Sequence, residues 1–298
     1  MGLLDRSGAA RPSLPELLAA GETVLAPGCY DALGARLIEE AGFRAAYMTG
    51  FGSAASRLGA PDVGLLTLCE MVDNAHRIAQ AVEIPVIADA DTGYGNPINV
   101  IRTVREYEAA GVAAIHLEDQ VMPKKCGHME GKQLVAPKEM AAKVAAAIAA
   151  RRSPGFLIIA RTDARAVEGL DAALERARLY REAGADVLFV EAPESEGEIE
   201  AIARSLADVP LLFNYAEGGK TPAVTLEFLR EQGFMLVIFP ISLLLAATRS
   251  MRSVLERIKE DGTPINAVSS LPAFGEFLDF IGMPQVRALE RRFSDRRR

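Results

Sequence analysis

Hydrophobic residues along this 298-residue chain concentrate in eight short runs, each nearly continuous and bounded by glycine, proline or polar residues. Such runs are typical of parallel β-strands that are buried on both faces. Between several of them lie stretches with helical periodicity, and most of these end in a glycine, as expected just after a last helical turn. The sequence therefore predicts alternating strands and helices. The runs are 23–28, 45–50, 85–91, 113–119, 156–163, 187–193, 210–214 and 236–240, and the clearest helical stretches are 96–111, 136–152, 169–184 and 221–233.

Eight β/α units without a Gly/Ser-rich linker favour one α/β domain folded as a (β/α)8 TIM barrel. We expect residues 1–298 to form this single domain, with the barrel at about 20–258 and a C-terminal helical extension at about 259–298. The eighth helix should begin near Ile241. A Rossmann-like sheet is the alternative, but no G-x-G-x-x-G follows the first strand. The surplus amphipathic material after the barrel predicts packing on a neighbouring subunit, so we expect an oligomer.

Composition and charge argue against several classes of protein. The formal charge is −7 and the isoelectric point is near 5.2, whereas nucleic-acid and anionic-membrane binders need a positive surface. The chain has no uninterrupted apolar run of about 18 residues, and its N-terminal stretch shows no secretory h-region. Three widely spaced cysteines suit reduced thiols better than disulfides. We therefore expect a cytoplasmic protein without nucleic-acid or membrane partners.

Polar residues gather where the predicted strands end, which is where a TIM barrel builds its active site. Helix N-capping accounts for any one of these residues as readily as function does, but it does not account for the whole ring. The residues are Asp89 and Asp91, Glu118 and Asp119, Arg161 and Asp163, Glu191, Asn214, and Ser242.

Three of these carboxylates predict a metal site. Asp89 and Asp91 lie two apart on an extended strand end, so both side chains should point to one face, where Glu118 from the neighbouring strand can join them. Carboxylates held together repel one another unless a cation neutralises them. Hard oxygen ligands suit Mg²⁺, or Mn²⁺ in its place, better than Zn²⁺. His116 shares the strand parity of Glu118 and is left open.

Two anion-binding groups are predicted at the same end of the barrel. Arg161 offers a fixed fork of donors to a substrate carboxylate or a developing enolate oxygen, although a salt bridge to Asp163 or Glu191 is the alternative. The glycine-rich stretch Thr49–Ser53 offers backbone N–H groups to a second anion. The titratable or thiol residues that fit ordinary packed or surface positions are His76, Cys29 and Cys69.

A long loop after the fourth strand, with a proline and two glycines before a helix near Pro137, predicts a lid. Its Cys126 lies among Lys124, Lys125 and His128, and their positive charge should favour the thiolate. We therefore expect Cys126 to donate and accept protons, rather than to be an exposed loop cysteine of no consequence.

Several motifs together resemble the isocitrate lyase/phosphoenolpyruvate mutase superfamily. They are KKCGH at Lys124–His128, the Asp89-x-Asp91 pair, Glu118-Asp119, ARTDA at Ala160–Ala164, and Asn214 followed by EGGKTP, in a likeness that runs from about Gly28 to Ser242. The resemblance implies a Mg²⁺-dependent barrel and a small di- or tricarboxylate substrate. It also implies a homotetramer, a dimer of dimers in which the eighth helices are swapped. Members that cleave carbon–carbon bonds carry the cysteine found here at 126, whereas phosphonate-processing members do not.

The resemblance further implies roles for individual residues. Asp89 would ligate the metal directly or through water, with Asp91 and Glu118 holding its water shell. Arg161 would join the groups that bind a substrate carboxylate. The residues that we expect to bind substrate are Thr49, Gly50, Phe51, Asp62 on a gating loop, Lys124, Gly127, Glu191, Asn214 and Ser242.

The implied reaction is a retro-aldol cleavage that leaves a 2-oxo acid and a carbanion held as an aci-carboxylate. Cys126 would protonate that carbon, and Tyr47 or a metal-bound water would take the hydroxyl proton. The expected catalytic residues are thus Cys126, Arg161, Tyr47 and His128.

The length of the chain and the absence of one cationic residue narrow the choice of substrate. Isocitrate lyases are much longer, whereas methylisocitrate lyases have the right size but usually read KRCGHR and carry an arginine after the eighth strand, where this chain has Met129 and Leu245. Loss of a cation disfavours a tricarboxylate, since an unpaired buried carboxylate is costly. We therefore expect a 2,3-dimethylmalate lyase-like enzyme that cleaves a 2-alkylmalate to pyruvate, or another 2-oxo acid, plus a carboxylic acid. The alternatives are a methylisocitrate lyase, an oxaloacetate decarboxylase, a phosphonate mutase or hydrolase, and a non-catalytic dicarboxylate-binding barrel.

Overall fold

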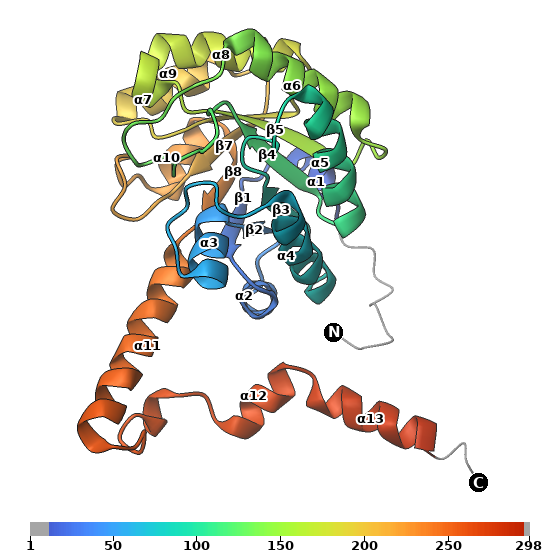
Figure 1. Cartoon of the computed structure of the whole chain (residues 1–298), viewed down its shortest axis with the longest axis vertical. Helices are drawn as coiled ribbons and strands as arrows, with labels where there is room; N and C mark the ends of the chain where they lie inside the picture. Colours follow the sequence, from blue (N-terminus) through green and yellow to red (C-terminus); the bar gives the residue numbers. More distant parts are fainter. Residues whose placement is uncertain (1–11, 295–298) are drawn as a thin grey trace. The chain divides into compact units, whose positions relative to one another are not determined.

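Eight parallel strands close into a barrel in chain order, β1 to β8, and this confirms the predicted TIM-barrel fold (Figure 1). The computed structural model describes residues 12–294; the last four residues of the predicted extension, and most of the N-terminal stretch in which we expect no secretory signal, lie outside them. The strands are β1 (Val24–Cys29), β2 (Ala46–Met48), β3 (Val86–Asp89), β4 (Ala114–Glu118), β5 (Leu157–Thr162), β6 (Val187–Val190), β7 (Leu211–Asn214) and β8 (Phe234–Phe239).

Helices that follow the strands from β1 to β7 surround the barrel on its outside (Figure 1). Several are closed at the C-terminus by a glycine in the left-handed region, such as Gly111 after α5 and Gly233 after α10, as their Ala-Gly and Gln-Gly endings predicted. The helices are α1 (Leu14–Ala19), α2 (Ala32–Glu40), α3 (Gly50–Leu58), α4 (Leu68–Ala81), α5 (Pro97–Ala110), α6 (Pro137–Ala150), α7 (Arg165–Glu168), α8 (Leu170–Glu182), α9 (Glu196–Ser205), α10 (Leu226–Glu231), α11 (Ser242–Asp261), the short 3₁₀ helix η1 (Val268–Ser270), α12 (Phe274–Phe280) and α13 (Met283–Ser294).

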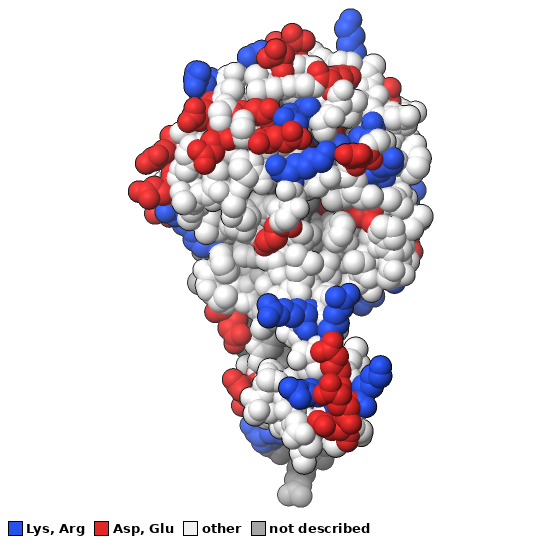
Figure 2. All heavy atoms as spheres, turned by 90° about the vertical axis from the view of Figure 1, so that its left-hand side faces the viewer, with Lys and Arg blue, Asp and Glu red and all other residues white. Residues whose placement is uncertain are grey.

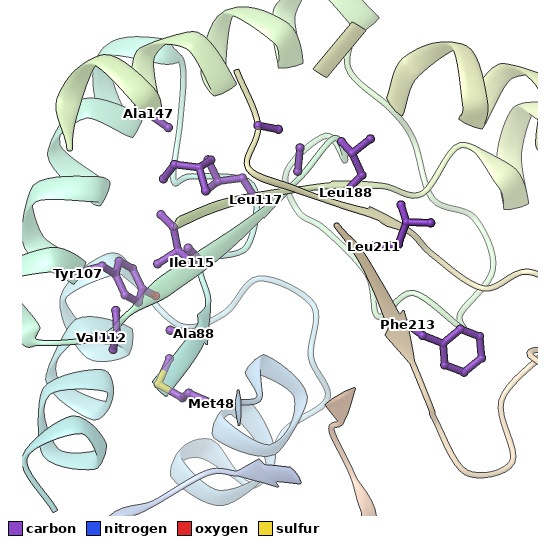
Figure 3. Close-up of a cluster of buried hydrophobic side chains, with 14 of the residues drawn as sticks. Met48, Ala88, Tyr107, Val112, Ile115, Leu117, Ala147, Leu188, Leu211 and Phe213 are labelled. Atoms are coloured by element: carbon purple, nitrogen blue, oxygen red, sulfur yellow. The ribbon is translucent and has the colours of Figure 1, made fainter. Parts of the chain in front are cut away.

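The two faces of the strands bury two separate clusters. Outward-facing side chains such as Met48, Ile115 and Leu117 pack against the helices, where Tyr107 and Ala147 lie (Figure 3). Inward-facing apolar side chains fill the barrel and meet α1, which closes the end at which the strands start. Because side chains alternate along a strand, each strand contributes to both clusters.

The chain divides into two units, and the division falls within α11. The barrel unit is Pro12–Leu244, and the described part of the other unit is 245–294. Within the C-terminal unit, apolar side chains such as Met251, Leu255 and Phe274 are exposed. In the part of the chain that the structure describes, no helix is long and apolar enough to cross a membrane.

Candidate active site

The inward-facing positions change from apolar to polar towards the C-terminal end of the barrel. Ile87 is followed two residues later by Asp89, and Ile159 by Arg161. Adjacent strands place these polar residues side by side, since Asp89 pairs with His116 and Glu118 pairs with Arg161 in the barrel register. The strand period therefore creates the ring of charge that the strand endings predicted.

This ring opens into a cavity of about 260 Å³ between the strand ends and the lid. The structure brings most of the predicted site residues to its wall. Those that line it are Tyr47, Thr49, Phe51, Asp62, Asp89, Glu118, Lys124, Cys126, Gly127, His128, Arg161, Glu191 and Asn214.

Three predicted site residues do not line the cavity, but each of them contacts a residue that does. The backbone N–H of Gly50 donates to Asp89 Oδ2 at 3.2 Å, so Gly50 supports that carboxylate. Asp91 Oδ1 lies 2.7 Å from Lys124 Nζ. Ser242 donates to Glu217, which does line the cavity and which the sequence reasoning noted only as part of the EGGKTP motif.

The three carboxylates predicted to hold a metal are arranged differently from the expectation. Strand β3 ends at Asp89, and Asp91 adopts the left-handed conformation with φ 48°, so the extended backbone invoked to place both side chains on one face is wrong. Lys124 Nζ lies between Asp91 and Asp62, 2.7 and 2.6 Å away. Over residues 12–294, no three His, Cys, Asp or Glu side chains converge enough to hold an ion by themselves.

The donor chemistry nevertheless fits a hard cation that keeps much of its water. Glu118 Oε1 is buried without a hydrogen-bond partner. Burial raises the pKa of Asp91 to about 6, with Asp89 and Asp62 adding to the rise and Lys124 opposing it. Burial likewise raises the pKa of Glu118 well above its usual range. A nearby cation would offset the burial that raises these pKa values, and Mg²⁺ needs only one or two protein carboxylates.

Cys126 reaches the cavity as a neutral thiol, which corrects the predicted thiolate. Burial raises its pKa, and the backbone N–H of His128 and the charge of Arg161 only partly oppose that effect. Lys124, expected to favour the thiolate, turns instead to Asp62 and Asp91. A protonated thiol in a cavity is suited to donating a proton.

Arg161 forms the salt bridge that the sequence offered as the alternative, and it also lines the cavity. Its Nε and Nη2 each donate to Asp163 at 3.0 Å, which is the structural salt bridge. Its Nη1 lies 3.4 Å from both Glu118 and Glu191 at the cavity wall. The surrounding carboxylates raise its pKa well above the usual range despite burial, so the guanidinium is a permanent cation facing the cavity.

Tyr47 and His116 form a buried pair beside Asp89. Tyr47 Oη and His116 Nε2 lie 2.7 Å apart. Burial raises the pKa of Tyr47 well above its usual range and lowers that of His116 to about 4. Tyr47 is therefore a phenol at neutral pH, which suits a hydrogen-bond donor and disfavours the role of base.

The lid lies across the cavity and is bonded to two other loops. His128 Nδ1 accepts the backbone N–H of Lys220 at 3.1 Å, and its Nε2 lies 3.4 Å from Glu191 Oε1. Lys132, which the sequence reasoning passed over, is buried and bonded to Asp163. Its type and its place in a glycine-containing loop carried no signal that it would be buried.

Another part of the wall comes from the start of α3. Thr49 caps this helix, its side-chain oxygen accepting the Gly52 N–H at 3.2 Å. The N-terminus of a helix favours a nearby anion, and here the Asp89 carboxylate accepts the Gly50 N–H. On the face shown in Figure 2, basic and acidic side chains are interspersed.

Comparison with known proteins gives matches over nearly the whole chain. Residues 14–259 match the family model described as phosphoenolpyruvate phosphomutase. The chain is 48% identical to 2,3-dimethylmalate lyase of Eubacterium barkeri, over 94% of this chain and 96% of that protein. It is also 48% identical to 2-methylisocitrate lyase of Aeropyrum pernix, over 95% of this chain and 91% of that protein.

Solved structures agree with these matches. An oxaloacetate acetylhydrolase in complex with the inhibitor 3,3-difluorooxalacetate superposes with a TM-score of 0.89 at 38% identity, covering 95% of this chain and 96% of that one. A phosphonopyruvate hydrolase in complex with oxalate and Mg²⁺ superposes with a TM-score of 0.85 at 34% identity, covering 93% and 96%.

Proposed function

The chain belongs to the phosphoenolpyruvate phosphomutase family, within the superfamily shared with the isocitrate lyases, and from this membership we propose that it cleaves a 2-alkylmalate-type dicarboxylate in the presence of Mg²⁺. Its relatives support a carbon–carbon lyase, as predicted. The proposed substrate resembles 2,3-dimethylmalate, and the products are a 2-oxo acid such as pyruvate and a carboxylic acid.

The observation that carries this proposal is the neutral thiol of Cys126 at a cavity wall that also holds Arg161 and the carboxylate pair Asp89 and Glu118. Cleavage of the substrate leaves a carbanion next to a carboxylate, and that carbon needs a proton. A site that only bound a dicarboxylate would need cations, but it would not need a proton donor.

Asp89, Asp91 and Glu118 would hold the Mg²⁺, with Mn²⁺ as a substitute. The ion would lower the pKa of the substrate hydroxyl and stabilise the 2-oxo-acid oxygen that forms. Support comes from the oxygen-rich donor set and the unpartnered Glu118 Oε1, and the phosphonopyruvate hydrolase relative was solved with oxalate and Mg²⁺.

The protein groups then divide the remaining work. Arg161 and the start of α3, at Thr49, Gly50 and Phe51, bind substrate carboxylates. As the carbon–carbon bond breaks, the Cys126 Sγ–H donates its proton to the departing carbon, and Arg161 stabilises the thiolate that remains. Tyr47 donates a hydrogen bond to a substrate oxygen, and solvent takes the hydroxyl proton.

The remaining proposed substrate contacts fall in two groups. Lys124, Gly127 and His128 approach from the lid, whereas Asp62 holds Lys124 from its own loop. Glu191 and Asn214, joined by hydrogen bonds of 3.1 and 3.2 Å, form another part of the wall, and Ser242 acts through Glu217. These contacts would set the size of the alkyl groups that the cavity accepts.

A product assay with Mg²⁺ tests the proposal directly. Pyruvate plus propionate from 2,3-dimethylmalate is the expected result. Pyruvate plus succinate from 2-methylisocitrate would instead favour the second candidate, which the equally similar Aeropyrum relative supports. Oxalate plus acetate, or pyruvate plus CO2, from oxaloacetate would identify a hydrolase or a decarboxylase.

A Cys126→Ser variant separates catalysis from mere binding. We expect turnover to collapse while oxalate binding with Mg²⁺ persists. Unchanged turnover would remove Cys126 from the mechanism, and a wild-type protein that binds oxalate but turns over none of these substrates would favour a non-catalytic barrel.

Assembly and location complete the proposal. The exposed apolar side chains of the C-terminal unit, among them Leu255, Phe274 and Phe277, support burial against other copies of the chain. We propose a homotetramer, a dimer of helix-swapped dimers, in the cytoplasm. Sedimentation that shows a monomer at micromolar concentration would contradict this assembly.

A further inference from the structure

Lys132 is a buried lysine in the part of the lid that follows the KKCGH motif and leads to α6. Its side chain is 1% exposed, although it lies in a loop whose neighbours Gly131 and Gln133 are exposed. An ammonium group removed from water is costly unless it is paired and hydrogen-bonded. The contacts of Lys132 must therefore compensate for the loss of its hydration.

Those contacts join the lid to the barrel. Lys132 Nζ donates to Asp163 Oδ1 at 3.0 Å and also to the backbone carbonyl of Gly127. Asp163 follows β5 directly and is fully buried. One ammonium group thus connects the residue next to Cys126 with a carboxylate fixed at a strand end.

The same carboxylate holds the substrate-facing cation. Asp163 accepts two hydrogen bonds of 3.0 Å from Arg161. Gly127 packs closely on this group, because a Cβ added there would lie 2.6 Å from Arg161 Nη2 and from Glu191. The Lys132 ammonium, Asp163 and Arg161 therefore form a continuous path from the lid to the cavity wall.

Lys125 provides a natural contrast within the same loop. Its Nζ also donates to a backbone carbonyl, that of Gly131, at 2.8 Å, but this contact is exposed and stays inside the lid. Loss of Lys125 therefore removes a lysine–carbonyl bond without untying the lid from the barrel.

We infer that Lys132 is a positioning residue that ties the lid to Asp163 and so sets the Cys126 thiol against Arg161. This inference rests on the proposed lyase function for its kinetic consequence. The position of the lid itself is independent of the substrate and can be measured without turnover.

The decisive experiment follows alkylation of Cys126 by iodoacetamide, read by mass spectrometry of its peptide. Exposed Cys69 on α4 serves as the internal reference, and buried Cys29 should not react. In Lys132→Met we expect Cys126 to be alkylated about tenfold faster relative to Cys69, because the lid opens locally more often. Mg²⁺ with oxalate should protect Cys126 in the wild type and much less in the variant. Lys125→Met keeps the contact between Lys132 and Asp163, so the lid should protect Cys126 from alkylation as it does in the wild type.

Turnover provides the second readout. With the substrate identified by the product assay, we expect kcat of Lys132→Met to fall about a hundredfold with little change in KM, as for a misplaced reacting group. Lys132→Arg, which keeps a cation for Asp163, should recover most of that loss. Equal alkylation rates in the wild type and Lys132→Met would overturn the inference, as would an identical effect of Lys125→Met.

A second variant covers the case in which Lys132→Met does not fold. Gly127→Ala keeps the Lys132 side chain but pushes the lid away from Arg161 and Glu191 by steric overlap, so it should also speed Cys126 alkylation. If Gly127→Ala leaves the rate unchanged, the lid is not tied at this point. If no substrate is turned over but the alkylation pattern is as expected, the lyase proposal fails, whereas the inference that Lys132 holds the lid in position stands.

Discussion

Substitution of Gly50 by alanine tests how the predicted metal ligand Asp89 is held. A Cβ at position 50 would lie 2.3 Å from Asp89 Oδ2 and 2.9 Å from its Cγ, whereas ordinary contacts begin at 3.4 Å. The carboxylate must therefore retreat by about 1 Å, because the surrounding core is close-packed and cannot absorb the methyl group elsewhere. The N–H of residue 50 that now donates to Asp89 would be displaced as well.

We expect Gly50→Ala to lower both the stability of the protein and its catalytic rate. Overpacking of this kind destabilises a protein by about 1–3 kcal/mol, which urea unfolding measures. A displacement of about 1 Å at a reacting centre lowers the rate by about a hundredfold. We also expect a higher Mg²⁺ concentration for half-maximal activity, since the displaced carboxylate is a proposed ligand.

The assay is Mg²⁺-dependent release of the 2-oxo acid, with Mg²⁺ binding measured separately by calorimetry. Gly197→Ala is the matched control, because Gly197 lies in α9, where an added Cβ meets only Ser195 Oγ at 3.9 Å. An alanine there should be neutral or slightly stabilising. Wild-type Mg²⁺ affinity and kcat in Gly50→Ala would refute the reasoning that Gly50 positions Asp89.

Two further predictions address pH and stability. Burial raises the pKa of Cys126 above 9.0, the ordinary pKa of a cysteine thiol, so activity should persist through pH 9.0 and fall only above it, as the thiol deprotonates. A pH–rate profile in which a Cys126-dependent fall occurs below pH 9.0 would count against a neutral proton donor. Asp119→Asn should destabilise the fold by about 3 kcal/mol in urea unfolding, because the buried carboxylate accepts from Thr162, Tyr180 and the Asp163 N–H besides facing Arg176, and an amide has only one acceptor oxygen. Asp73→Asn, at an exposed ion pair, should leave the stability nearly unchanged, and similar losses of stability in the two variants would refute the argument.

The fold could be predicted from the sequence because strand and helix periods are local properties. All eight predicted strands form. Strand β8 begins at Phe234, two residues before the start of the predicted run at 236. The helix predicted over 221–233 shortens to α10 (Leu226–Glu231), because Thr225 caps it from within the stretch. Family membership and the lyase class are confirmed, because they depend on short motifs that remain intact along the chain.

The candidate site was predictable as a set of residues but not as a network. Strand endings alone indicated that Asp89, Glu118 and Arg161 would meet, since parallel strands in a barrel end at one edge. The partner of each charge could not be predicted, because it depends on which side chains are desolvated together. Lys124 was expected to act on Cys126, and it pairs with Asp62 and Asp91 instead.

By itself, the sequence determined the barrel, the end at which charged residues gather and the types of those residues, because these follow from periodicity and motif. The tertiary structure alone decided the left-handed backbone of Asp91, the neutral state of the Cys126 thiol and the burial of Lys132 against Asp163. Each of these depends on burial and on charges brought together from distant parts of the chain. Electrostatic energies depend strongly on that environment, so they are set only when the barrel has closed and the lid lies over it.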